Sequence, residues 1–183
     1  MTTEINNLAT LIAEVQNGFQ PKYLFFWGHQ PHKDGQIGKS CLSQWWDSSF
    51  EIDGILYRTA EHYMMAEKAR LFGDEESRQA ILNVEHPNEA KRLGRKAKGF
   101  DEALWKQHRY EIVVQANVAK FGQNEALGTF LTNTQERVLV EASPYDKIWG
   151  IGLKEDDPKA QNPEQWAGLN LLGFALMEVR NRL

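Results

Sequence analysis

The sequence predicts a mainly helical protein with a small β-sheet, and three observations lead to this fold class. Along most of the chain, apolar residues recur every three or four positions between Gly, Pro, Asp or Asn residues, as in amphipathic helices. Two short runs, at 23–27 and 138–142, have the apolar and aromatic composition of buried strands. A chain of 183 residues can bury one core without metal or disulfide bonds, so a single compact domain is expected.

The expected elements of the first half follow from local signals. Asp53 and Gly54 interrupt an apolar alternation and predict a hairpin, because this pair suits the two-residue turn between antiparallel strands. Thr59 and Asp74 each precede a helical pattern as capping residues, and Pro87 suits a first helical turn. In chain order, the expected elements are a helix at 4–17, a strand at 23–27, a hairpin at 50–58 and helices at 60–72, 75–82 and 87–99.

The second half is expected to contain the longest helix. Leu104, Trp105 and Ile112 recur at helical spacing after the capping residue Asp101, and Gly122 is expected to end the helix. A polar stretch before the last apolar pattern has the composition of a loop. In chain order, the expected elements are helices at 102–121 and 124–132, a strand at 138–142 and a helix at 169–182.

Charge and composition narrow the classes of function. The 21 basic and 25 acidic residues give a net charge of −4, which argues against a broad electrostatic surface for duplex DNA but allows a local cationic pocket. No apolar run approaches membrane-spanning length, and Glu4 and Glu14 interrupt the N-terminal apolar pattern, unlike in a signal peptide. Because Cys41 is the single cysteine, no internal disulfide can form, and a cytoplasmic protein with no membrane partner is expected.

Two apparent motifs do not match the patterns that they resemble. The GQIGKS string resembles a phosphate-binding P-loop, but Lys33 stands where that pattern needs glycine. His29, His32 and His62 have neither a second cysteine nor a His-Glu-x-x-His pattern to complete a metal site. The sequence therefore predicts no P-loop and no metal.

The stretch TAEHYMMAEKA at 59–69 places chemistry-bearing side chains on one helix. Glu61 and Lys68 are seven residues, or two turns, apart and so project from the same face, with Met64 and Met65 between them. This mixture suits the wall of a partly buried pocket. From spacing alone, an ordinary half-exposed amphipathic helix is the simpler interpretation.

Two further groups lie near the C-terminus. Asp146 and Trp149 stand in a Gly- and Pro-containing loop, where an indole can stack on a flat heterocycle or a sugar. Alternatively, the indole fills the core and the carboxylate caps a turn. Gly168, Asn170 and Gly173 surround the start of the last helix, whose free backbone amides suit a phosphate. Here the alternative is helix packing through small residues.

Together these strings resemble the YbiA-like family, also called NADAR. The motifs are Glu-His-Tyr at 61–63 with Lys68, Leu-Gly-Arg at 93–95, Lys-Phe at 120–121, a Leu-Val-Glu strand, an Asp…Trp-Gly-x-Gly loop and Asn-x-Leu-Gly…Leu-Met-x-x-Arg. The resemblance covers about residues 23–183. We therefore expect a YbiA-like domain at 21–183 and an N-terminal helical extension at 1–20.

The resemblance implies a mainly helical enzyme that cleaves N-glycosidic bonds. Some members are similar to hydrolases of early riboflavin-pathway intermediates, aminopyrimidines that carry a phosphoribosyl group, and others to enzymes that remove ADP-ribose from guanine bases. The expected partner is thus a small phosphoribosyl or ADP-ribosyl substrate, with ADP-ribosylated nucleic acid or binding without catalysis as alternatives. Gln44, Arg58, Ala60 and a longer loop at 153–167 depart from the family pattern and leave the substrate open.

The chemistry assigns roles to the matching residues. Breaking a ribosyl C–N bond develops positive charge on the sugar and requires protonation of the leaving nitrogen. Asp146 is expected to act on the sugar side and Glu61 in proton transfer, and the two roles are exchangeable. Lys68 is expected to hold a phosphate or carboxylate, or else, if desolvated, to form a Schiff base with the ring-opened sugar. This chemistry needs no metal and no cofactor.

The remaining candidates are expected to bind the substrate. Trp149, with Phe26 or Trp27, is expected to sandwich the base, while Arg95 and the amides before Asn170 receive phosphate. The mechanism requires the two acids to meet at one anomeric carbon. The predicted substrate-binding residues are Phe26, Trp27, His62, Arg95, Trp149, Gly150 and Asn170.

Overall fold

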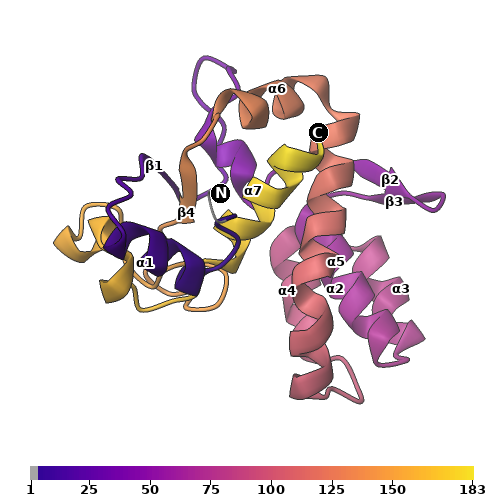
Figure 1. Ribbon diagram of the computed structural model, residues 1–183. Coiled ribbons are helices and arrows are strands. Elements are labelled where there is room, and N and C mark those ends of the chain that lie inside the picture. The colour runs from indigo at the N-terminus through magenta and orange to yellow at the C-terminus, as the bar shows by residue number, and fades with distance from the viewer. Residues whose placement is uncertain (1–3) are drawn as a thin grey trace. The chain divides into compact units, whose positions relative to one another are not determined.

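A computed structural model describes residues 4–183 and shows mostly helix (Figure 1). The described chain contains seven α-helices, three short 3-10 helices and two pairs of strands. The predicted fold class, mainly α with few strands, is confirmed, although the strands form two separate pairs. Residues 1–3 of the predicted N-terminal extension lie outside the described residues. The boundary predicted at residues 20 and 21 stays a prediction.

The chain divides into two compact units, which are described separately here. One unit comprises the N-terminal segment up to Ser43 together with Thr129–Leu183, and the other comprises Gln44–Gly128. The chain passes between them before Gln44 and again within helix α6 (Glu125–Asn133). The first unit is therefore built from both ends of the sequence.

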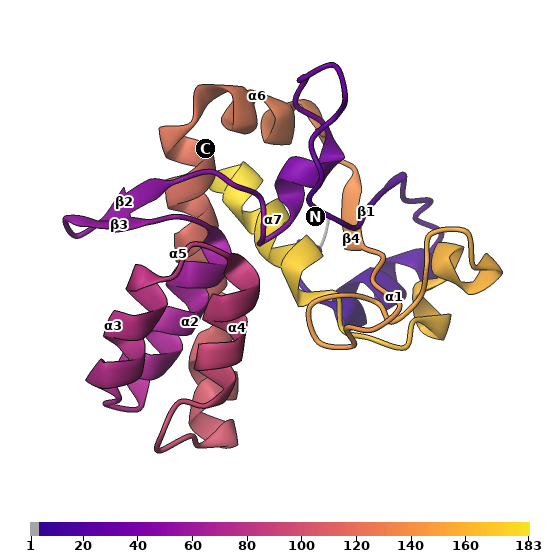
Figure 2. The ribbon, with the colours of Figure 1, turned by 180° about the vertical axis from the view of Figure 1, so that it is seen from behind.

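The first unit is organised around a parallel strand pair. β1 (Tyr23–Phe26) pairs with β4 (Val138–Glu141), with Tyr23 opposite Val138 and Phe26 opposite Glu141. α7 (Leu171–Arg182) packs against β4, and both elements bury most of their residues (Figures 1 and 2). Further elements of this unit are α1 (Leu8–Gln16) and the 3-10 helices at Lys39–Leu42, Pro158–Gln161 and Pro163–Gln165.

The second unit is built around α2 (Ala60–Leu71). Eight of the twelve residues of α2 are buried, because α3, α4 and α5 all pack against it (Figure 2). The interpretation that spacing alone favoured, a half-exposed amphipathic helix, is therefore wrong. The other helices are α3 (Glu75–Asn83), α4 (Pro87–Arg95) and α5 (Glu102–Gln123).

The predicted hairpin is confirmed as β2 (Phe50–Ile52) and β3 (Ile55–Tyr57). Asp53 and Gly54 have φ angles of 52° and 77°, the left-handed values that a two-residue turn of this type requires. The ring of Phe50 stacks on Tyr57 at 5.9 Å, and Tyr57 meets Tyr63 of α2 edge-on at 4.9 Å. These aromatic contacts join the hairpin to α2.

Helix boundaries differ from the predictions where side chains cap the backbone. α1 begins at Leu8 rather than residue 4, because Asn7 and Thr10 form a reciprocal capping box. α4 ends at Arg95, short of the glycine at 99, and α5 continues through Gly122 to Gln123. Within residues 4–183, no helix has both the length and the apolar composition that crossing a membrane requires.

Candidate active site

Glu61 is a buried acid in the first turn of α2. Thr59 caps this helix, and its hydroxyl accepts a hydrogen bond from the backbone N–H of His62. The Glu61 side chain is 4% exposed, and its own backbone N–H donates to the carbonyl oxygen of Gln44 at 3.1 Å. A helix N-terminus favours a carboxylate, because the unpaired N–H groups there carry partial positive charge. The structure thus gives Glu61 a sheltered position, as a proton-transfer residue requires.

Lys68 lies two turns further along α2 and is half-buried. Its Nζ atom is 4.8 Å from the ring centre of Phe100 and 5.6 Å from that of Trp105. Within residues 4–183, this ammonium group has no hydrogen bond and no ion pair with an acid. Burial lowers the pKa of Lys68, the positive charge of Arg95 lowers it further, and Glu61 acts in the opposite direction. The amine is therefore easier to deprotonate than an ordinary lysine.

His62 is almost fully enclosed, and both ring nitrogens have protein partners. Nδ1 lies 2.7 Å from the hydroxyl oxygen of Thr59, and Nε2 lies 3.0 Å from the carbonyl oxygen of Val84. Burial lowers the pKa of His62, which favours a neutral ring that donates from Nε2 to Val84 and accepts at Nδ1. His62 could contact the substrate, as predicted, only by giving up one of these two hydrogen bonds. We therefore assign His62 a positioning role.

A buried pair of side-chain amides, those of Gln44 and Asn117, joins the segment before β2 to α5 and was not predicted. The side-chain amide of Asn117 donates to Oε1 of Gln44 at 2.8 Å and to the carbonyl oxygen of Val113 at 2.8 Å. The Nε2 atom of Gln44 and the Oδ1 atom of Asn117 are buried without hydrogen bonds. Asn117 lies on the apolar face of α5, and a polar residue among apolar neighbours is the only sequence signal that marks it.

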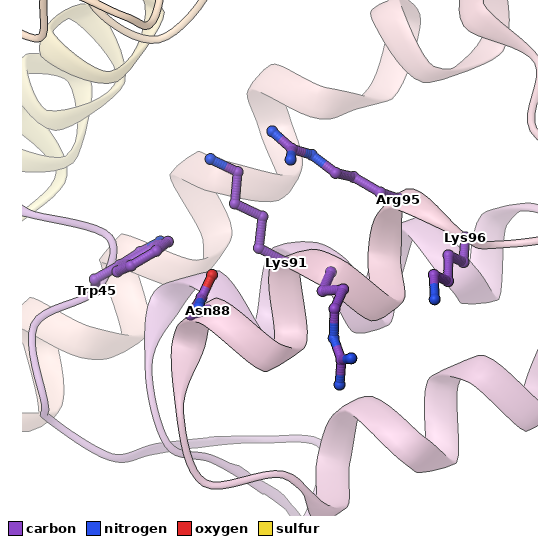
Figure 3. Close-up of a pocket in the computed structure, with 6 residues that line it drawn as sticks. Trp45, Asn88, Lys91, Arg95 and Lys96 are labelled. Carbon is purple, nitrogen blue, oxygen red and sulfur yellow. The ribbon is translucent and has the colours of Figure 1, made fainter.

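Arg95 lies at the end of α4, on a surface pocket of about 370 Å³ (Figure 3). α4 lies close to α2 at Gly94, where an added Cβ atom would come within 2.1 Å of the sulfur of Met65. This close approach explains why the charge of Arg95 reaches Lys68. The residues that line the pocket are Trp45, Asn88, Lys91, Arg92, Arg95 and Lys96.

In the first unit, Asp146 organises the loop that carries Trp149. Its Oδ1 atom accepts hydrogen bonds from the backbone N–H groups of Ile148 at 2.9 Å and Trp149 at 2.8 Å. Its own N–H donates to the hydroxyl oxygen of Ser143 at 3.1 Å. The other carboxylate oxygen has no hydrogen bond within the described chain. Asp146 therefore caps a turn, as the alternative interpretation expected, and still has one oxygen for a ligand.

The start of α7 differs from the predicted phosphate site. Four consecutive backbone N–H groups, from Leu169 to Leu172, donate to carbonyl oxygens of the 147–150 loop. A phosphate at this helix terminus would have to displace those bonds. The Asp146 loop thus already engages the N–H groups of Leu169 to Leu172, and a phosphate on the amides before Asn170 stays a prediction.

Asn170 joins β4 to α7 and adopts left-handed backbone geometry with φ 54°. Its side chain is fully buried, with Oδ1 accepting from the N–H of Glu141 at 3.0 Å and Nδ2 donating to the carbonyl of Leu139 at 2.9 Å. Gly173 lies against the same place, since an added Cβ would come within 2.0 Å of the Leu139 oxygen. Asn170 and Gly173 thus shape the strand–helix junction. Gly150 is buried in the adjoining loop, where a Cβ would come within 2.9 Å of the Glu141 oxygen.

An Asn170→Gly variant is expected to lose about 2–6 kcal/mol of unfolding free energy. The variant leaves one buried N–H and one buried carbonyl of β4 unpaired, at about 1–3 kcal/mol each, whereas glycine tolerates the left-handed backbone. Denaturant unfolding measures this loss. Gln135→Gly is the matched control, because exposed Gln135 has the same φ of 54°. An equal loss in both variants would contradict the assignment.

The predicted aromatic residues have different environments. Phe26 is 1% exposed and belongs to the core, whereas Trp27 directly after it is 51% exposed. The ring of Trp27 lies 6.0 Å from that of Tyr145, which is 83% exposed. Trp149 is half-buried beside the Asp146 turn. Trp27 is thus better placed than Phe26 to stack on a ligand, and Tyr145 adds an exposed ring that the sequence did not single out.

The candidate residues divide between the two units. Glu61, His62, Lys68 and Arg95 belong to the second unit, and the other candidates belong to the first. The convergence of Glu61 and Asp146 at one anomeric carbon stays a prediction. Among residues 4–183, no group of three or more His, Cys, Asp and Glu side chains is placed to hold a metal ion.

Comparison with known proteins gives consistent matches. The NADAR domain family matches residues 25–183 of the chain. N-glycosidase R617 of Acanthamoeba polyphaga mimivirus is 40% identical over 164 residues, which cover 87% of this chain and 95% of that protein. N-glycosidase YbiA of Escherichia coli (strain K12) is 33% identical over 133 residues, covering 73% of this chain and 74% of that protein.

The solved structure of the E. coli protein YbiA shares this fold. It has a TM-score of 0.71 and 27% identity, over 90% of this chain and 86% of that chain. The predicted YbiA-like fold is thereby confirmed. Riboflavin biosynthesis protein PYRR of Zea mays is 32% identical over 138 residues, which cover 72% of this chain but 20% of that longer protein.

Proposed function

The chain belongs to the NADAR domain family, and on this premise we propose that it hydrolyses the C–N bond between a phosphoribosyl group and a nitrogen heterocycle. The names of R617 and YbiA support N-glycosidase activity, and the name of PYRR supports an aminopyrimidine phosphoriboside of riboflavin biosynthesis as the substrate. The observation that carries the proposal is Lys68, a half-buried amine with a lowered pKa on the same helix as the buried acid Glu61.

We propose that Lys68 is the nucleophile rather than a phosphate ligand. A phosphate ligand works best as a fully charged ammonium group, whereas Lys68 is desolvated and lies against two aromatic rings, which makes its neutral form accessible. This proposal departs from the role that the sequence favoured. The change rests on the lowered pKa of Lys68 and on its ammonium group forming no ion pair with an acid within residues 4–183.

The reaction begins when the neutral amine of Lys68 attacks the anomeric carbon. The C–N bond to the heterocycle breaks, and the leaving nitrogen takes the bonding electron pair and a proton from Glu61. The attacking nitrogen then gives a proton to the Glu61 carboxylate, which passes it to the ring oxygen as the ribose ring opens, and a Schiff base remains. Water hydrolyses this Schiff base, releases the ribose phosphate and restores Lys68.

Further candidate residues are proposed to act on the substrate. We propose that the unengaged oxygen of Asp146 stabilises the positive charge that develops on the sugar. Trp149 and Trp27 offer indole rings for stacking on the heterocycle. Arg95 is proposed to pair with phosphate, because the amides of α7 are already occupied.

The test of this function is a substrate comparison with purified protein. Release of ribose 5-phosphate from an aminopyrimidine phosphoriboside is expected, and release of ADP-ribose from modified guanine measures the alternative substrate. Borohydride added during turnover should reduce the Schiff base and leave the sugar phosphate covalently attached to Lys68, as peptide mass spectrometry would detect. A protein that binds these compounds but cleaves neither would be a binding module.

The dependence of kcat on pH is expected to report Lys68. Because the amine must be neutral to attack, kcat rises with pH through the pKa of Lys68, which lies below the ordinary lysine value. Arg95→Gln removes a positive charge that lowers this pKa, so the rising limb should move to higher pH. Arg70→Gln is the control, since Arg70 lies on the same helix but is not among the charges that shift Lys68. An unmoved limb in Arg95→Gln would exclude Lys68 as the titrating group.

A further inference from the structure

Gln44 lies in the segment before β2 and connects α2 to α5. Its carbonyl oxygen accepts a hydrogen bond from the backbone N–H of Glu61 at 3.1 Å. That N–H belongs to the first turn of α2, where a helix leaves its backbone donors without partners inside the helix. The side-chain oxygen Oε1 of Gln44 accepts from Nδ2 of Asn117 at 2.8 Å. Gln44 thus joins the backbone of the proposed proton donor to a side chain of α5.

The orientation of the Asn117 amide is fixed by α5 itself. Nδ2 also donates to the carbonyl oxygen of Val113 at 2.8 Å, one turn earlier in the same helix. A carbonyl oxygen can only accept, so the nitrogen side of the Asn117 amide faces Val113, and Gln44 must present its oxygen to that nitrogen. Asn117 has no exposed surface, and Gln44 is 7% exposed. The pair is therefore held in one arrangement by a 22-residue helix.

The two amides make the folded state less stable than an apolar pair would. Nε2 of Gln44 and Oδ1 of Asn117 are buried and have no hydrogen bond within the described chain. A buried polar atom without a partner destabilises the folded state, whereas apolar side chains of the same shape in both places are nearly neutral or stabilising. Packing therefore gives no reason for two amides here, and the link to Glu61 gives one.

We propose that Asn117 is a positioning residue that acts through Gln44 to place Glu61 for proton transfer to the leaving nitrogen. Asn117 fixes the side chain of Gln44, and the carbonyl oxygen of Gln44 fixes the backbone N–H of Glu61. Proton transfer needs the acid within hydrogen-bond reach of the leaving nitrogen, and a displacement of about 1 Å lowers a rate by about 10²-fold. The inference rests on the proposed hydrolysis and adds two residues to its machinery.

The first test compares two substrates in Asn117→Leu, because leucine has nearly the same shape as asparagine. Single-turnover release of the heterocycle from an aminopyrimidine phosphoriboside is expected to fall by about 10–10²-fold, with little change in substrate affinity. Release of pyridine from a ribosyl pyridinium needs no protonation and should change by less than about threefold. An equal loss with both substrates would overturn the proposal, since a general distortion of the site slows both reactions.

A double variant separates positioning from stability. Gln44→Met together with Asn117→Leu replaces both amides by apolar side chains of similar shape and removes the two unpaired atoms. The midpoint of its denaturant unfolding should equal or exceed that of the wild type. Its release of the aminopyrimidine should nevertheless show the loss expected for Asn117→Leu. Release at the wild-type rate would overturn the proposal, because the amides would then be dispensable for proton transfer.

Gln115→Leu is the matched control on the same helix. Oε1 of Gln115 accepts a hydrogen bond from the hydroxyl of Tyr63 at 3.1 Å, so this variant also removes a side-chain bond between α5 and α2. That bond does not lead to the backbone of Glu61, and both substrates should react at wild-type rates. A loss confined to the aminopyrimidine substrate and equal to that of Asn117→Leu would overturn the assignment to Asn117.

Amide hydrogen exchange tests the backbone link without any substrate. In ¹⁵N-labelled protein, the N–H of Glu61 should exchange at least about tenfold faster in Asn117→Leu than in the wild type, and at the wild-type rate in Gln115→Leu. Unchanged exchange in Asn117→Leu would overturn the link from Asn117 to Glu61. Faster exchange in a protein whose wild type cleaves neither substrate would instead overturn the proposed hydrolysis, so the two failures are distinguishable.

Discussion

Lys68→Arg is expected to abolish borohydride trapping and to lower kcat by on the order of 10³-fold or more. Arginine keeps the positive charge and much of the length of lysine, but it cannot lose its proton in the accessible pH range and so cannot form a Schiff base. Phe100 and Trp105 also accept an arginine side chain, because guanidinium groups pack well on aromatic faces. The variant therefore removes nucleophilicity and retains charge.

This substitution separates the two roles of Lys68 directly. A lysine that only held phosphate would be replaced by arginine with a modest rise in KM and little change in kcat. Lys106→Arg is the control, because that lysine is exposed on α5. Trapping by Lys68→Arg at the wild-type level would show that the covalent intermediate forms at another residue.

Glu61→Gln is expected to lower kcat by about 10²–10⁴-fold with little effect on substrate affinity. Glutamine is nearly isosteric, so it preserves the buried packing at the start of α2 while removing the transferable proton. The defect should depend on the leaving group. A ribosyl pyridinium, whose leaving nitrogen is already charged, needs no proton and should be cleaved almost as well by the variant as by the wild type.

Glu67→Gln provides the comparison for this measurement. Glu67 lies on the same helix but pairs with Arg70 at 2.8 Å. Removing the Glu67 carboxylate should leave the dependence of kcat on leaving-group basicity unchanged. If Glu61→Gln were equally defective on the pyridinium substrate, Glu61 would act on the sugar, and the exchange of roles with Asp146 would follow.

The elements that the sequence predicted well have strong local causes. The Asp53-Gly54 turn and the cap at Thr59 satisfy backbone groups within a few residues, so their signals are readable in isolation. The pairing of β1 with β4 is different, because residues 27–137 separate the two strands. No local pattern specifies which distant strand completes a parallel pair, and this partnership was not predicted.

The candidate site likewise depends on long-range contacts that local sequence patterns do not specify. The spacing of Glu61 and Lys68 on one helix face was readable, but their burial depends on three helices that pack around α2. The α7 amides were expected to be free because an isolated helix leaves its first N–H groups unpaired. The loop from Lys147 to Gly150 satisfies them instead. Tertiary partners therefore decided which predicted groups remain available to a ligand.

The parallel pairing of β1 and β4 has a consequence for biosynthesis. A ribosome delivers β1 early, but β1 must wait without its partner until more than half of the chain has followed. The segment Gln44–Gly128 is contiguous, so it can fold while the rest is still being translated. Long-range pairing of this kind is slow, because the intervening loop must close first. We therefore expect chaperones to bind the nascent chain at the apolar strand YLFF while it lacks its partner.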